Sequence, residues 1–442
     1  MTSLPKANAR CGVGLFQAVA GEHDNCNILV SPVNATSALG LLALASGCEQ
    51  AAEIEKEQEK TERCPKPRPA PEPTCPRARP SPEPACPKPR DSRRPIPRPC
   101  PEPEPEPCPR REPCPRRNVP DYVCEKPEGV HTAFSKILAT LNKPSTNYAL
   151  SIADKVYGDI SIDFIQKFLF CALKLYRTEV EGADLHNAPE EVRRLANLWV
   201  EIQTHDKVKD LLPKNSFDCL AQLVQVNSLY FKGCWEVKFD KELTVEAPFY
   251  THDADERNCP TVQLMHRKGV YNTATIDICG EEVQVLEIPY KDKELSFFVL
   301  LPTDCSAEAL QQLEDGLSHE DLLDLSCELK SAEVDVSLPK FCLERSLHLL
   351  EYLNLHNLMD PEKADFSGAT STEDVGVTAL IHSAHVAIDE DGGEEPEARR
   401  CPRDRRPRRE CVLFQANHPF LFYIQHNCSQ SIIAFGRFSR PE

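Results

Sequence analysis

The 442-residue chain lacks the signatures of several large classes of protein. No apolar run approaches the ~18 residues of a membrane span, and the first ten residues have no apolar stretch typical of a secretory signal. No glycine-rich phosphate loop, Gly-x-Ser-x-Gly turn, His-Glu-x-x-His pair or Cys-x-x-Cys pair occurs. We therefore expect a protein that is not an enzyme and holds no metal or cofactor. We expect it in the cytoplasm, with nuclear residence or release without a signal peptide as alternatives.

A net positive charge is confined to few stretches of the chain, and residues 63–117 form the longest of them. The net charge is −18, yet residues 63–117 contain 14 basic and seven acidic residues, so the rest of the chain is strongly acidic. An acidic body with one basic segment excludes a generally basic nucleic-acid binder. We expect neither a membrane nor a nucleic acid as the partner of the body.

The basic stretch also has the most unusual composition. Residues 64–117 contain no glycine, glutamine or aromatic residue but 21 of the 39 prolines, and an 11-residue repeat fills 64–74 and 75–85. Proline at nearly every second position removes backbone donors and forbids helix and sheet, so the segment is expected to be extended and disordered. The chain is thereby divided into residues 1–60, a disordered insert over 61–127 that is rich in cysteine, proline and arginine, and residues 128–442.

Seven of the 21 cysteines belong to this insert. They are Cys64, Cys75, Cys86, Cys100, Cys108, Cys114 and Cys124. Zinc sites use more closely spaced pairs, and nucleic-acid binding lacks aromatic side chains for stacking. A passive disordered loop and covalent cross-linking remain open. Polyproline geometry would hold Cys64 and Cys75 ~30 Å apart, far beyond the ~6 Å between bridged Cα atoms. We therefore expect seven free thiols and a monomer in a reducing cytosol, and bridges between molecules on oxidation.

The remainder of the chain carries helices and strands in blocks. Apolar residues at helical spacing cover 12–20, 36–46, 163–176 and 190–203, and in the last segment Leu195, Leu198, Trp199 and Ile202 share one face. Strand patterns cover 223–231, 295–301, 332–338, 419–426 and 431–437. Blocks without βαβ alternation predict the α+β class. Cysteines scattered here, Cys171 among them, are interpreted as small apolar side chains.

A charged segment separates two strand patterns near the C-terminus. Residues 390–411 read EDGGEEPEARRCPRDRRPRREC, and seven arginines lie between 399 and 409. One interpretation is a solvated charge run. The other is a bait for trypsin-like proteases, because such enzymes cleave after arginine on exposed, mobile loops.

Short motifs spread over nearly the whole chain outside the insert carry a family resemblance. They are Val30-Ser-Pro32, Asn197-Leu-Trp-Val200, Val226–Gly233, Leu338-Pro-Lys-Phe341, Asp365-Phe-Ser-Gly368, Phe414–Phe420 and Phe435-Gly-Arg-Phe438. Together they resemble the serpins, and specifically the intracellular ovalbumin-like group. The resemblance implies a serpin fold with three β-sheets, eight or nine helices and an exposed reactive loop at about 390–413. It also implies that the insert lies between the third and fourth helices.

The resemblance assigns two groups of functional residues. In family inhibitors a protease attacks the reactive loop, and the cut loop then inserts as a central strand of the large sheet. A polar cluster under that sheet, the shutter, corresponds to Ser31, Asn34, Asn227 and His382, with Asn34 in place of the usual serine. The hinge that starts insertion corresponds to Glu390, Asp391, Gly392, Gly393, Glu395, Pro396 and Glu397.

The resemblance also places the bond that a protease would cut. Sixteen positions after the first hinge acid the bond is Arg406–Pro407, which most trypsin-like enzymes cut poorly. Counting back from Phe414 favours Arg405 instead, and Arg409 ends a sequence typical of sites for furin-like convertases. A trypsin-like or furin-like protease is the expected partner at this loop.

The hinge departs from the pattern of family inhibitors, which carry small residues where this chain has charges. Alternate residues of an inserted strand face the core, so the inward set would be Gly393, Glu395, Glu397, Arg399 and Cys401. Burying unpaired charges costs several kcal/mol each, and Pro396 lacks the donor that a central strand requires. We expect the loop to be cleaved as a substrate, and the protein to act mainly as a non-inhibitory binding or cross-linkable structural protein. The alternative is a suicide inhibitor of serine proteases with an arginine at the scissile bond.

Overall fold

The computed structural model describes residues 4–54, 122–251, 259–391 and 411–442, apart from six single positions within these ranges. The disorder expected for the insert concerns residues that lie almost entirely outside this part of the chain. The compact unit that carries the described elements comprises residues 1–66 and 124–442.

The described helices and strands occur largely in separate blocks along the chain, which confirms the predicted α+β class. The helices are α1 Leu4–Glu22, α2 Pro32–Ala45, α4 Val130–Leu141, α5 Gln166–Cys171, α6 Pro189–Gln203, α7 Ala307–Gly316, α8 His319–Glu328 and α9 Leu349–Tyr352. The strands are β1 Ile28–Val30, β2 Tyr148–Asp159, β3 Glu179–Ala183, β4 Leu223–Gly233, β5 Val245–Pro248, β6 Thr261–Ile278, β7 Glu281–Pro289, β8 Leu295–Pro302, β9 Lys330–Pro339, β10 Phe341–His348, β11 Val377–Ile388, β12 Val412–Gln415, β13 Phe420–His426 and β14 Ser431–Phe438.

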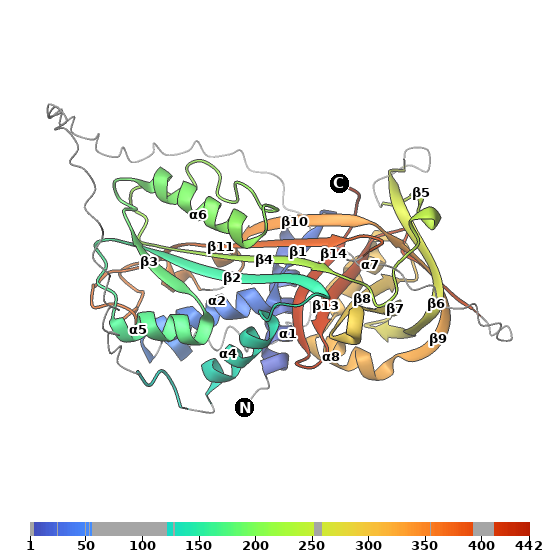
Figure 1. Cartoon of the computed structure of the whole chain (residues 1–442), viewed down its shortest axis with the longest axis horizontal. Coiled ribbons are helices and arrows are strands. Elements are labelled where there is room, and N and C mark those ends of the chain that lie inside the picture. The colour runs from blue at the N-terminus through green and yellow to red at the C-terminus, as the bar shows by residue number, and fades with distance from the viewer. Residues whose placement is uncertain are drawn as a thin grey trace, which may run out of the picture. The chain divides into compact units, whose positions relative to one another are not determined.

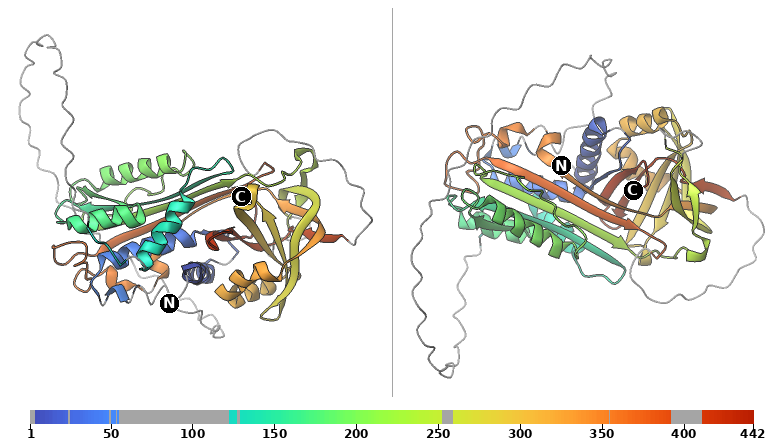
Figure 2. Two further views of the ribbon diagram at one scale, coloured as in Figure 1. Left: turned by 60° about the horizontal axis from the view of Figure 1, so that its bottom comes forward. Right: turned by 90° about the horizontal axis from the view of Figure 1, so that it is seen from above.

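A five-stranded sheet runs in the order β10-β11-β4-β2-β3. Its two central strands, β4 and β11, pair in parallel from Leu223 and Val377 at one end to Lys232 and Ala387 at the other. Figures 1 and 2 show α6 on one face of this sheet and α2 on the other. The sheet is therefore covered on both sides, and we call the junction between β4 and β11 its seam.

The remaining described strands form one continuous sheet in the order β1-β14-β13-β8-β7-β6-β9-β12, with β5 attached to β6. Strand β6 joins its two parts: residues 264–273 pair with β9, whereas 272–278 pair with β7. The second and third sheets that the resemblance implies are thus hydrogen-bonded to each other through one long strand. Figure 1 shows this strand in yellow at one side of the molecule.

Helix α2 begins where the sequence predicts. The Ser31 side chain accepts a hydrogen bond from the backbone of Asn34, and Pro32 occupies the first turn. Serine is a favoured N-cap, and proline is tolerated at this place because its missing N–H would have no helical partner. Nearly every residue of α2 is buried, which places the helix in the core beneath the five-stranded sheet.

The buried face of α6 is not the apolar face that Leu195, Leu198, Trp199 and Ile202 share. The buried apolar residues are Val192, Ala196 and Val200, and of the four only Trp199 packs against them. Leu195, Leu198 and Ile202 have relative exposures of 50, 53 and 61%. Polar side chains complete the buried face. Arg193 and Asn197 are both buried and both donate to the backbone carbonyl of Leu212.

The chain is tied into the folded body again at Cys124. This residue forms a disulfide with Cys171, the last residue of α5. The next residue, Glu125, accepts hydrogen bonds from the backbone and hydroxyl of Thr132 at the start of α4. Three expectations from the sequence therefore change. Cys171 and Cys219 are both disulfide-bonded and not simply small apolar side chains, and Cys124 is bonded within the chain.

Candidate functional site

The arginine-rich segment connects the end of β11 to the start of β12. Its described ends are Asp391 and Cys411. The proposed scissile residues, Arg405, Arg406, Pro407 and Arg409, lie outside the described residues, as do the hinge residues Gly392, Gly393, Glu395, Pro396 and Glu397. The insert cysteines Cys64, Cys75, Cys86, Cys100, Cys108 and Cys114 also lie outside them. The site is therefore built from the ends of the loop and from the seam into which a loop of this family would insert.

The first hinge residue is held firmly at the end of β11. Glu390 is 5% exposed, and its carboxylate accepts hydrogen bonds from Lys340 at 2.8 Å and Thr244 at 3.1 Å. Burial alone would raise the pKa of Glu390, but hydrogen bonds from Lys340, its own backbone and Thr244 outweigh burial and lower it. The carboxylate is thus ionised and paired.

Its two neighbours are paired in the same way. Asp391 forms ion pairs with Lys241 and, at 3.2 Å, with Lys238. The hydrogen bond from Lys241 is the main reason that the pKa of Asp391 is lowered, despite the opposing effect of partial burial. Asp389 lies 3.2 Å from Lys232 of β4, which links the two sides of the seam. All three acids at the end of β11 are thus paired with lysines. These lysines come from β4, from the segment before β5 and from the β9–β10 junction.

An aromatic cluster supports this end of the seam. The indole nitrogen of Trp235 donates to the backbone carbonyl of Asp389 at 2.7 Å. The Trp235 ring is stacked on Tyr290 with centroids 4.4 Å apart. Because both rings are almost fully buried, they fix the backbone at the point where β11 leads into the loop.

The structure brings three of the four predicted shutter residues into one hydrogen-bonded chain. The backbone N–H of Ser31 donates to Nε2 of His382 at 3.0 Å, and Nδ1 of His382 bonds Oδ1 of Asn227. Nε2 is an acceptor here, so the ring is neutral with its proton on Nδ1. Burial lowers the pKa of His382 to about 3, which keeps it neutral at physiological pH. His382 of β11 and Asn227 of β4 therefore join the two strands directly across the seam.

Asn34 lies beside this cluster without entering its side-chain network. It is 1% exposed, and within the described part of the chain neither of its side-chain polar atoms has a hydrogen-bond partner. Its backbone N–H donates to the Ser31 hydroxyl at 3.3 Å. Unpaired buried amides cost free energy, so the Asn34 side chain destabilises the packing beside this cluster.

Sequence reasoning missed a second buried polar pair in the same sheet. Both oxygens of Asp154 on β2 accept hydrogen bonds from the Gln225 amide on β4, at 3.0 and 2.9 Å. Burial raises the pKa of Asp154 to about 7. The only sequence signal was an aspartate and a glutamine within strand patterns, where such residues usually face solvent.

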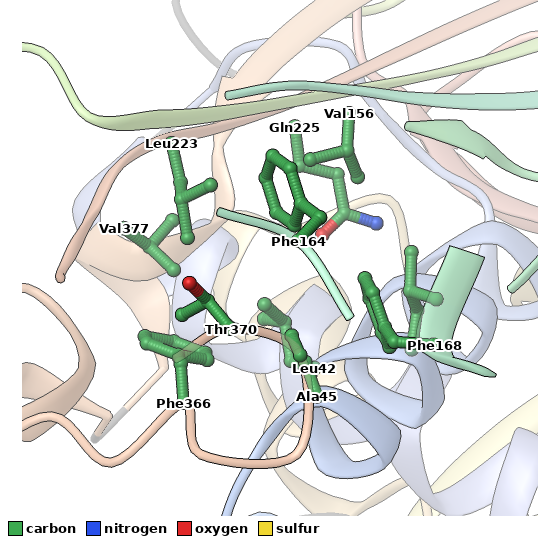
Figure 3. Close-up of a pocket in the computed structure, with 12 residues that line it drawn as sticks. Leu42, Ala45, Val156, Phe164, Phe168, Leu223, Gln225, Phe366, Thr370 and Val377 are labelled. Atoms are coloured by element: carbon green, nitrogen blue, oxygen red, sulfur yellow. The ribbon is translucent and has the colours of Figure 1, made fainter. Parts of the chain in front are cut away.

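A small cavity lies at the other end of the seam, near the first residues of β4 and β11. Its volume is about 30 Å³, and its walls include Leu223, Val377 and Phe164. Figure 3 shows these apolar side chains with Gln225 entering from the sheet. This volume is large enough for a water molecule but too small for a ligand the size of an aromatic ring. We assign this cavity to imperfect packing beneath the seam.

Comparison with known proteins agrees with this geometry. Residues 6–441 match the family model described as serpin, serine protease inhibitor. Human serpin B3 is 32% identical over 446 residues, covering all of both chains. Horse leukocyte elastase inhibitor is 37% identical over 71% of this chain and 83% of its own. The chain belongs to the serpin family, a family of protease inhibitors and not of enzymes, and its curated relatives are of the ovalbumin-like group.

Solved structures support the same assignment. A structure described as a tumour-suppressing serpin covers all of the chain with a TM-score of 0.74 at 25% identity. Uncleaved ovalbumin covers 99% of the chain with a TM-score of 0.74 at 24% identity, a likeness of fold alone. The predicted serpin fold is thereby confirmed. None of the described helices is long and apolar enough to cross a membrane.

Proposed function

We propose that this serpin presents its arginine-rich loop to trypsin-like or furin-like proteases and is cut there as a substrate. On this proposal it acts mainly as a non-inhibitory binding or cross-linkable structural protein of the cytoplasm. One observation carries the proposal: the hinge sequence places carboxylates opposite an apolar seam. The loop residues are taken from the sequence, and the seam from the described strands.

The seam is closed along its whole length in the described structure. Ten residue pairs align β11 with β4, and a new strand would have to replace every hydrogen bond between them. The side chains on the core side include Leu229, Phe231, Ala384 and Val386, all fully buried. On the opposite side, beneath α6, lie Val224, Val226 and Ala379. An inserted strand would therefore be enclosed on both faces.

Charged residues fit this enclosure poorly. Alternation along an extended strand would direct Glu395 and Glu397 toward the core side. Neither β4 nor β11 carries an arginine, and the single lysine, Lys232, pairs with Asp389 on the other side. Unpaired buried carboxylates cost several kcal/mol each, and Pro396 cannot donate to either neighbouring strand. Slow insertion would let hydrolysis of the acyl-enzyme finish first, which is substrate behaviour.

The alternative is a suicide inhibitor with an arginine at the scissile bond. It is favoured by family membership and by the shutter hydrogen bonds through His382, which are the contacts that insertion must open. The two candidates differ in one observable, the covalent complex with the protease.

The test is incubation with an equimolar trypsin-like protease, followed by a denaturing gel. We expect two fragments cut within 399–409 and no band at the summed mass. A matched variant, E395A/P396A/E397A, removes the two charges and the proline and should give a covalent complex. A covalent complex with the unaltered protein would overturn the proposal. Absence of a covalent complex with the E395A/P396A/E397A variant would also overturn it.

A further inference from the structure

A second concave site lies on the α6 side of the five-stranded sheet, beside the end of the seam at which Lys232 pairs with Asp389. It is an open pocket of about 430 Å³ between the start of β2, the end of β4 and the turn after α6. This volume falls within the ~300–1,000 Å³ typical of small-molecule sites. The side chains that matter for the argument are Lys207, Lys232, Tyr230, His205, Ser145 and Thr146, all of which line it.

Two lysines give the pocket its charge. Lys207 is exposed and, within the described part of the chain, has no carboxylate at ion-pair distance. Lys232 contributes a second ammonium group and also pairs with Asp389 at 3.2 Å. Other acids lie close to the pocket. Glu294 interacts with Tyr148 at the rim, Glu344 lies near Cys342 beside Lys207, and Asp292 accepts a hydrogen bond from Asn147, next to Thr146. Within the described residues, the Lys207 ammonium group therefore has no carboxylate at ion-pair distance, and the Lys232 ammonium group is shared with Asp389.

The backbone fixes Lys207 at the rim. The two residues before it, His205 and Asp206, both adopt left-handed conformations, with φ of 52° and 60°. The residue after it, Val208, is 1% exposed, and its N–H donates to the Thr204 hydroxyl at 3.1 Å. Left-handed conformations are unfavourable for residues other than glycine, and they persist where the surroundings enforce them. The backbone of Lys207 is thus held between the strained turn at His205 and Asp206 and the buried residue Val208.

Aromatic rings form one wall. The Tyr230 ring lies 5.6 Å from the His205 ring and 5.4 Å from the His385 ring, measured between centroids. Tyr230 is 5% exposed, so its neighbours hold it rigidly. On the other side of the pocket, Ser145 and Thr146 add hydroxyl groups that can donate to an oxyanion.

We propose that this pocket binds a small organic dianion, a phosphate monoester or a dicarboxylate. Lys207 and Lys232 bind the charged group, the hydroxyls of Ser145 and Thr146 complete its hydrogen bonds, and the Tyr230 wall packs against the body of the ligand. No residue of the reactive loop takes part, so this proposal does not depend on how a protease cuts that loop.

The shared lysine couples this pocket to the seam. Because Lys232 also holds Asp389, a bound anion and the Asp389 carboxylate compete for one ammonium group. Removing that carboxylate should therefore strengthen ligand binding, whereas removing the Lys207 charge should weaken it. A site that merely attracted anions to an exposed lysine would not respond to Asp389 in this way.

The test is calorimetric titration of the full chain with AMP and with succinate, using adenosine as the uncharged counterpart of AMP. We expect at least one dianion to bind saturably, and adenosine to bind about tenfold more weakly than AMP if the phosphate ester is the preferred class. Lys207→Gln should weaken binding by about tenfold, and Asp389→Asn should strengthen it. Lys209→Gln is the matched control, because Lys209 pairs with Glu201 and does not line the pocket.

Three results would overturn the proposal. The first is no saturable binding of either dianion up to about 5 mM, the weak end of specific binding. The second is equal binding of AMP and adenosine without binding of succinate. The third is a Lys207→Gln protein that melts normally and binds as well as the unaltered protein. Lys207 is exposed, so its substitution tests binding and not folding.

Discussion

At the scale of single residues, two buried titratable groups in one sheet respond to pH in opposite directions. The folded-state pKa of His382 is depressed, so its contribution to stability is lost as pH falls below its ordinary value of 6.5. The folded-state pKa of Asp154 is raised, so the folded state holds a proton that the unfolded chain has released. Stability therefore falls as pH rises from 3.8, the ordinary value for this carboxyl, through about 7.

Asp154→Asn should stabilise the protein above neutral pH. The pKa of Asp154 in the folded state is about three above its ordinary value, and each unit corresponds to about 1.4 kcal/mol. The gain in the free energy of unfolding at pH 8 is therefore at most about 4 kcal/mol. The new amide could also donate to Oε1 of Gln225, which has no hydrogen-bond partner within the described residues. The measurement is denaturant unfolding of both proteins at pH 5 and pH 8. The gain should be larger at pH 8, and an equal gain at both values would show that Asp154 does not titrate in this range.

At the scale of elements, the seam between β4 and β11 determines how the molecule responds to loop cleavage. Insertion of a cut loop adds a strand and its hydrogen bonds, which stabilises a serpin strongly. Here the inserted strand would carry Glu395 and Glu397 into an apolar enclosure. Under the proposed function, a few side chains of the hinge, and not the architecture of the sheet, decide whether the cut loop inserts.

Cleavage of the loop should raise the melting temperature by only a few degrees. The experiment compares trypsin-nicked and intact protein by calorimetry, with the E395A/P396A/E397A variant treated in parallel. The variant should gain tens of degrees on nicking, because small residues can enter the seam. A rise of that size in the unaltered protein would mean that the charges are accommodated.

The disulfide between Cys124 and Cys171 gives a second prediction at this scale. Because the folded body places the Cα atoms of these two residues 5.5 Å apart, mild oxidation should join them before either pairs with a thiol of another molecule. Peptide mapping by mass spectrometry of the oxidised monomer should recover this pair. Cys171→Ser should leave Cys124 open to alkylation. Recovery of Cys124 mainly in bridges between molecules would contradict the prediction.

At the scale of the whole molecule, the insert and the folded body are separable. The compact unit ends at residue 66 and resumes at Cys124, and Glu125 caps α4. A deletion that tests the insert should therefore stop at residue 121, so that Cys124 and Glu125 are kept. The acidic body and the basic insert would then be studied apart.

Deletion of residues 61–121 should leave folding unchanged and remove most disulfide-linked oligomers that form on oxidation. Six thiols, each followed by proline, are lost with the deletion, whereas the pairing of Cys124 within the chain is retained. Non-reducing gels of both oxidised proteins provide the measurement, with melting curves as the control for folding. Equal oligomer ladders from the full-length and deleted proteins would contradict the prediction. They would show that the insert is a passive loop and that cysteines of the body form the cross-links.

The sequence by itself determined the α+β class and the serpin family, because motifs such as Val30-Ser-Pro32 are local and specific. Only the tertiary structure decided which face of α6 is buried, because Arg193 and Asn197 find a buried carbonyl that is distant in sequence. The same holds for the pairs Asp154–Gln225 and Cys124–Cys171. Hydrogen bonds and disulfides between distant residues depend on how strands and helices are brought together, and periodicity along the chain does not record that arrangement.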